Sequence, residues 1–174
     1  YWKLDDGPGS TIARDDSGYG NHGTLTNYTG VQTSTGWVAM PSVTSHTGSF
    51  FNPYALEFDA VDDYIALGSI ASMPTDWTVS VWVNPNAADL YSSIVNLNDG
   101  ARYYGLDWYS NANGFQTYDN STAQVRSGST SDGIWYQVNA IKRAGAYEIW
   151  VNGTKYTTAY GGGFGFAGNR IGGG

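Results

Sequence analysis

Three carboxylates lie close together in the sequence, at Asp59, Asp62 and Asp63. Such a group could bind a cation, but turns between strands also collect Asp because its side chain accepts local backbone hydrogen bonds. Strand-like segments flank the group at residues 56–58 and 64–67. The pattern therefore favours a turn closing a loose hairpin over a metal site.

Hydrolysis of a glycosidic bond would need two carboxylates on either side of the scissile bond. The sequence has two Glu, Glu57 and Glu148, and both fit strand positions. His22 and His46 have no nucleophile motif or third metal ligand nearby, and we expect His22 to hydrogen-bond within its turn. Because Cys is absent, thiolate metal sites and cysteine nucleophiles are excluded. A non-catalytic protein is predicted, and a glucanase using Glu57 is the least favoured alternative.

The chain is rich in aromatic residues, with 7 Trp and 14 Tyr. Sugar rings pack their C–H faces on flat aromatic side chains, while amides bind their hydroxyls, so exposed aromatic residues beside amides would suit a glycan. Loops on a rigid scaffold are where binding residues concentrate, and residues 103–118 interleave aromatic side chains with amides. The predicted ligand-binding residues are Tyr103, Tyr104, Trp108, Tyr109, Asn111, Asn113 and Tyr118.

Three other tryptophans, Trp82, Trp135 and Trp150, fall on the polar phase of predicted strands. Exposed rings there, beside Asn, would form a platform for a glycan. The alternative is that the rings pack under loops or against a second sheet, since large amphipathic rings are often mostly buried. Both interpretations stay open, with burial favoured for Trp135.

The segment from Asp16 to Asn21 is a cluster of turn residues. A tight surface loop is the favoured interpretation, because Asp accepts backbone N–H bonds and Gly supplies positive φ. Calcium binding is the sharper alternative, since calcium takes six to eight oxygens from carboxylates and carbonyls. Its predicted ligands are the Asp16 side chain and the Asn21 carbonyl.

Alternation of apolar and polar residues predicts strands over most of the chain. In residues 77–83 it places Trp77, Val79, Val81 and Val83 on one face, and residues 134–141 repeat the pattern from Ile134. Asn152-Gly153 between residues 148–151 and 154–157 predicts a two-residue hairpin. Further strands are expected at 93–97, 103–108, 114–118 and 123–127. Many short antiparallel strands indicate an all-β, two-sheet sandwich.

Length and charge narrow the class of protein further. The 174 residues contain no repeat and no long linker, so we expect a single domain over residues 1–174. The net charge of −7 opposes nucleic acid and anionic membranes as partners. No apolar run approaches the roughly 20 residues of a spanning helix, so membrane insertion is not expected.

Several segments, in this order, resemble laminin-G-like domains of the concanavalin A-like lectin/glucanase superfamily. They comprise the opening residues 1–9, the Asp-Ser-Gly-Tyr-Gly-Asn-His-Gly run from Asp16, residues 55–59 and 62–65, residues 78–82, residues 135–138, residues 147–153 and residues 169–172. The resemblance implies a jelly-roll sandwich, with calcium often held near the loop at Asp16. Such domains usually end in a strand with an acidic pair. This sequence stops before one, so we expect that strand to be missing or supplied by another chain or segment.

The resemblance implies a recognition or adhesion module that binds a glycan or glycosylated surface without cleaving it. It would belong to a larger extracellular, cell-surface or virion-associated protein. A different class of function is an assembly domain of a phage virion, fibre or surface layer, which would make contacts with other protein chains. A glycan array separates the two.

Overall fold

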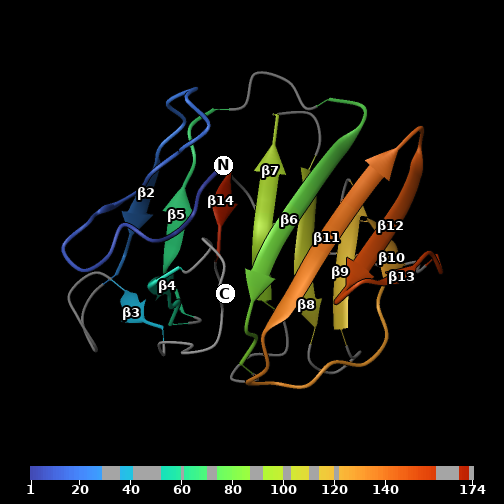
Figure 1. Ribbon diagram of the computed structural model, residues 1–174. Coiled ribbons are helices and arrows are strands. Elements are labelled where there is room, and N and C mark those ends of the chain that lie inside the picture. The colour runs from blue at the N-terminus through green and yellow to red at the C-terminus, as the bar shows by residue number, and fades with distance from the viewer. Residues whose placement is uncertain are drawn as a thin grey trace. The chain divides into compact units, whose positions relative to one another are not determined.

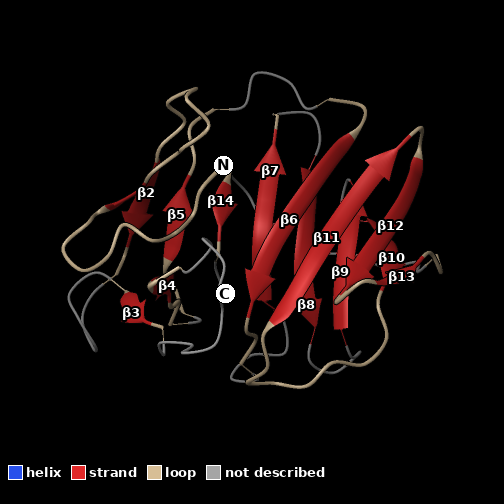
Figure 2. Cartoon of the chain, viewed as in Figure 1, coloured by secondary structure: helices blue, strands red, loops and turns tan. Residues whose placement is uncertain are grey.

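The computed structural model describes residues 1–28, 36–40, 52–59, 61–69, 74–86, 92–99, 103–109, 114–119, 122–159 and 169–172. Within these ranges the regular structure is strand throughout (Figure 2). None of the described residues forms a helix of the length and apolar character needed to cross a bilayer. The all-β prediction is confirmed.

The chain divides into two compact units, residues 1–68 and 69–172, which are described separately. In the first unit, β1 (Ile12–Ala13), β2 (Gly23–Thr26) and β5 (Tyr64–Ala66) pair antiparallel in that order. A separate pair joins β3 (Trp37–Ala39) to β4 (Tyr54–Leu56). The single domain over residues 1–174 stays a prediction.

The second unit is a sandwich of two antiparallel sheets, one in front of the other in Figure 1. The five-stranded layer has the order β14–β7–β8–β9–β10 and the four-stranded layer the order β13–β12–β11–β6. The first contains β7 (Ser92–Asn98), β8 (Tyr103–Tyr109), β9 (Gly114–Asp119), β10 (Thr122–Arg126) and β14 (Arg170–Ile171). The second contains β6 (Trp77–Val83), β11 (Tyr136–Arg143), β12 (Ala146–Val151) and β13 (Thr154–Tyr156).

Alternate residues of each strand fill the core between these two sheets. In β6 the predicted inner set, Trp77, Val79, Val81 and Val83, packs in or against the core. Val138 and Ala140 of β11 are fully buried opposite them. The predicted phase of residues 134–141 therefore holds from Tyr136 onward. Ile134 is an exception: it precedes β11 and is exposed, because the strand begins two residues later than its pattern indicates.

Local turn chemistry predicts the hairpin between β12 and β13 correctly. Asn152 and Gly153 both have positive φ, 48° and 81°, as a type I′ turn requires. Val151 and Thr154 face each other in the closing pair. The Asn152 side chain extends the ladder, since its Oδ1 accepts the Gln137 N–H at 2.9 Å.

The expected hairpin around Asp59–Asp63 is wrong in its pairing. The second arm forms β5, but only the first residue of the other arm, Leu56, lies in a strand, where it ends β4. In addition, β4 pairs with β3 and β5 pairs with β2. The turn at Asp59 does form. Periodicity identifies a strand without identifying its neighbour, because pairing depends on long-range packing.

An ion pair links the two sheets of the second unit. Lys142 of β11 is 9% exposed, and its Nζ lies 2.9 Å from Asp119 Oδ2 at the end of β9. The Tyr147 hydroxyl of β12 donates to the same oxygen. Burial has the largest single effect on the pKa of Lys142 and lowers it, but the hydrogen bonds and charges of Asp119 and Tyr147 together outweigh burial and leave the pKa raised. Asp119 therefore satisfies two groups that the sandwich takes out of water.

We expect Asp119→Ala to lower the free energy of unfolding by about 2–3 kcal/mol, because it leaves Lys142 largely buried without its countercharge. Denaturant unfolding at neutral pH measures the effect. Asp132→Ala is the matched control, since Asp132 lies exposed in a turn, and it should be nearly neutral. Equal losses in the two variants would contradict this role for Asp119.

Candidate functional site

The structure buries two of the predicted ligand-binding rings in the core. Tyr104 and Trp108 lie on the inner face of β8, where Tyr104 meets the edge of Trp77 with ring centres 6.1 Å apart. The Trp108 indole N–H donates to Thr130 Oγ1 at 2.8 Å. Placing these rings in a ligand platform was therefore wrong. Burial between the sheets removes a large apolar area from water, which favours the core position.

Tyr118 of β9 is also buried, but on the opposite face of the five-stranded sheet. A Cβ atom on Gly105 would lie 2.1 Å from the Tyr118 ring, so the ring occupies the space that this glycine leaves on the neighbouring strand β8. Its hydroxyl reaches Asn96 Oδ1 at 3.0 Å. Tyr118 thus ties three adjacent strands together and is closed to a ligand, which corrects its predicted role.

Tyr103 and Tyr109, at the two ends of β8, are half-buried. Arg126 lies over the Tyr109 ring, 5.4 Å from its centre. Asn111 and Asn113 lie outside the described residues. The structure therefore does not gather the predicted set into one accessible platform.

A different surface presents exposed rings and amides side by side. We call it the indole–amide face: Ser80, Trp82, Gln137, Asn139, Trp150 and Lys155, on the outer side of the four-stranded sheet. These residues point outward because side chains alternate along a strand, and the residues next to them in the same strands fill the core. Trp82 is 67% exposed, which excludes burial for this residue, while its role as a platform stays a prediction.

Amide hydrogen bonds order the middle of the indole–amide face. Gln137 Nε2 donates to Asn139 Oδ1 at 2.9 Å and Asn139 Nδ2 donates back to Gln137 Oε1 at 3.0 Å. Gln137 Nε2 also reaches Ser80 Oγ at 3.3 Å. Within these contacts, Asn139 keeps one amide N–H and both carbonyls keep acceptor capacity. The pair is thus fixed in place and still able to bind hydroxyls.

Trp150 lies at the far side of this face, on β12. It is half-buried, and Lys155 Nζ lies 5.6 Å from its ring centre, a cation–π contact. Lys155 also pairs with Glu148, and the hydrogen bond from Lys155 holds the pKa of that carboxyl below its usual value. The charges of Lys155 and Glu148 therefore offset each other. Trp135, which immediately precedes β11, is 39% exposed, so burial was the wrong expectation for it.

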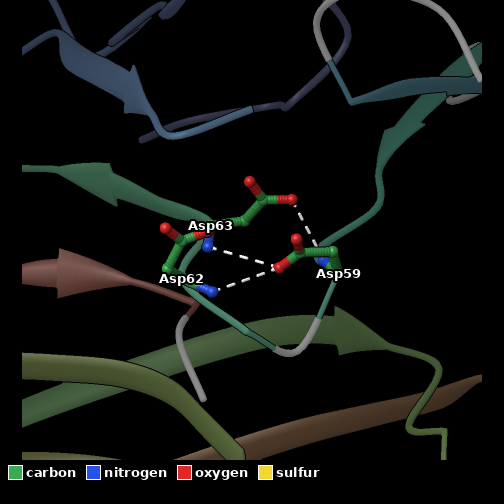
Figure 3. Close-up of side chains that lie close together, drawn as sticks. All are labelled: Asp59, Asp62 and Asp63. Atoms are coloured by element: carbon green, nitrogen blue, oxygen red, sulfur yellow. Dashed lines mark hydrogen bonds between the residues drawn. The ribbon is translucent and has the colours of Figure 1, made fainter. Parts of the chain in front are cut away.

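The acidic group of the first unit forms the predicted turn, shown in Figure 3. Asp59 Oδ1 accepts the N–H of Val61 at 2.8 Å and that of Asp62 at 3.2 Å, and the Asp59 N–H donates to Asp63 Oδ2 at 3.0 Å. One oxygen from each Asp lies within 4.8 Å of the others. Burial raises the pKa of Asp63. Local hydrogen bonds account for this arrangement, and we propose no cation here.

Asp15 organises the loop that contains Asp16 and Asn21. Its carboxylate accepts hydrogen bonds from the Tyr1 amino group at 2.8 Å and from the N–H groups of Ser17 and Asn21 at 2.9 Å each. These donors hold the pKa of Asp15 well below its usual value, and the hydrogen bond from the Tyr1 amino group has the largest effect. The Asp15 N–H donates to His22 Nδ1 at 3.0 Å, which confirms the predicted turn contact of His22.

The predicted calcium ligands already have partners in this loop. Asp16 Oδ2 lies 2.7 Å from Lys3 Nζ, and the Asn21 carbonyl accepts the Trp2 indole N–H at 2.8 Å. The Asp15 carboxylate is held by N–H donors. As arranged, the loop does not fit a calcium ion, which would have to displace Lys3. Calcium binding by Asp16 and Asn21 stays a prediction, and calorimetric titration tests it.

A two-layer antiparallel β-sandwich with an exposed aromatic and amide face is the class of structure defined here. A family model for the concanavalin A-like lectin/glucanases superfamily matches residues 58–172, about two thirds of the chain. The chain therefore belongs to this superfamily. The resembling segments before residue 58 lie outside the matched range. Comparisons with the curated proteins and with the solved structures returned no match.

We expect Asp15→Asn to lower the melting temperature at pH 7. The carboxylate offers two acceptor oxygens to its three donors, whereas the amide of Asn offers only one. The folded-state pKa of Asp15 lies below its ordinary value of 3.8. The contribution of the Asp15 carboxylate to the free energy of unfolding is therefore complete at pH values above 3.8, and it is lost as the pH falls below 3.8 toward the folded-state pKa. Thermal melts between pH 7 and pH 2 should show the variant and the wild type converging. Asp16→Asn is the control, since its exposed ion pair contributes little, and a larger loss there would contradict the assignment.

Proposed function

We propose that this protein is a non-catalytic carbohydrate-recognition module that binds neutral glycans on the indole–amide face. It would act outside the cell, on a cell surface or on a virion, as part of a larger protein. The observation that carries the proposal is Trp82, a large indole with two thirds of its surface exposed beside an ordered amide pair.

The chemistry of this face suits a sugar. The indole offers a flat apolar surface to pyranose C–H groups, and Gln137, Asn139 and Ser80 offer donors and acceptors to hydroxyls. An exposed indole offers a large apolar area whose burial by a ligand would be favourable. Membership of a superfamily whose description includes lectins supports the same class of ligand.

The same face supports binding rather than cleavage. None of the six residues that define this face carries a carboxylate. Glu148, two residues before Trp150 on β12, lies next to it and is paired with Lys155. Hydrolysis would normally require a second carboxylate across the bond. Glu57, the residue of the glucanase alternative, is exposed on the first unit.

Trp82→Ala should abolish binding to the glycan that the wild type binds on a broad array, while the melting temperature stays close to wild type because the ring is exposed. Calorimetry with that glycan measures the loss. Tyr19→Ala is the matched control, since Tyr19 is an aromatic residue 85% exposed on the first unit. It should bind normally.

Two other results would redirect the proposal. Loss of binding in Tyr109→Ala but not in Trp82→Ala would move the site to the five-stranded sheet. A blank array, together with self-association or capture of other chains that depends on Trp82, would favour the assembly domain. The position of β6 at the edge of the four-stranded sheet is the feature that favours this alternative, because an edge strand presents unpaired backbone groups.

A further inference from the structure

The two indoles of the indole–amide face lie on either side of β11. Trp82 on β6 is opposite Gln137, and Trp150 on β12 is opposite Asn139. They are thus separated by two strand spacings across the sheet and two residues along it, which places their Cα atoms about 12 Å apart. A single pyranose ring is too small to stack on both.

The groups between the indoles are those that a sugar chain would meet on the way. The Gln137–Asn139 amide pair occupies the middle, with Ser80 beside it. The face lies along the strands of a sheet, with Trp82 exposed and Gln137, Asn139 and Trp150 half-buried, so it suits the interior of a chain as well as a chain end. The order of groups across the sheet is therefore ring, amides, ring.

Charge on this face favours a neutral chain. Lys155, the cation in contact with Trp150, is paired with Glu148, and Arg143 at the end of β11 also acts on that carboxylate, so an acidic sugar against Trp150 would meet a carboxylate together with the cations. The Lys155 side chain is 44% exposed, and its ammonium can donate to hydroxyls of a sugar that lies against Trp150.

We infer that the ligand is a linear, neutral oligosaccharide segment that crosses β11 and contacts Trp82 and Trp150 with different sugar units. This inference rests on the proposed function and adds the ligand's length, charge and path. Trp82 provides the first contact, and Trp150 raises the affinity only of chains that are long enough to reach it.

The test uses calorimetry with ladders of linear neutral glucan, mannan and galactan fragments, from the monosaccharide to the hexasaccharide. For the wild type, affinity for at least one ladder should rise about tenfold with length and then level off, as expected for one added ring contact. Trp150→Ala should keep the affinity for the shortest fragment and lose the rise. Trp150→Phe, which keeps a flat ring, should retain most of it. Thermal melts verify that each variant is folded.

The outcomes separate this inference from the proposed function. Affinity independent of chain length, a rise unchanged in Trp150→Ala, or tighter binding of oligogalacturonate than of every neutral ladder would overturn the inference alone. No binding to any neutral ladder would also overturn it. If the full glycan array is blank as well, the proposed function fails with it.

Discussion

The second unit depends on one constraint: in each of its two sheets, every second residue of a strand must point into the core that the sheets share. Val138 and Ala140 of β11 are fully buried between the layers, and Leu106 of β8 is buried with them. Since successive side chains alternate in direction, the residues between them must face outward. Gln137 and Asn139 are therefore displayed by the same packing that hides their neighbours, and the candidate site is a consequence of the core.

The two outer faces of this sandwich use their polar residues differently. On the five-stranded sheet, Tyr118 spans to Asn96 and is closed to solvent. On the four-stranded sheet, the Gln137–Asn139 pair bonds within the plane of the face and leaves Trp82 exposed. Under the proposed function, amides already held in place beside a solvated ring would need little further ordering when a ligand binds.

Prediction from the sequence succeeded where the responsible physics is local. The turn at Asn152-Gly153 was predictable because both positions need positive φ, and β6 because its period-two pattern spans seven residues. It failed for the partner of β4, which depends on residues far away in the chain. It also failed for Tyr104 and Trp108, since an aromatic ring on a strand suits a ligand platform and a core equally well by type alone.

The sequence by itself determined the all-β class, most strand positions and which residues share a face, because alternation and turn chemistry act over a few residues. Only the tertiary structure decided that the face of β8 carrying Tyr104 and Trp108 becomes core, and that Trp82 on the outer face of β6 stays exposed. The physical reason is that burial depends on what packs against a face, and the packing partner lies elsewhere in the chain.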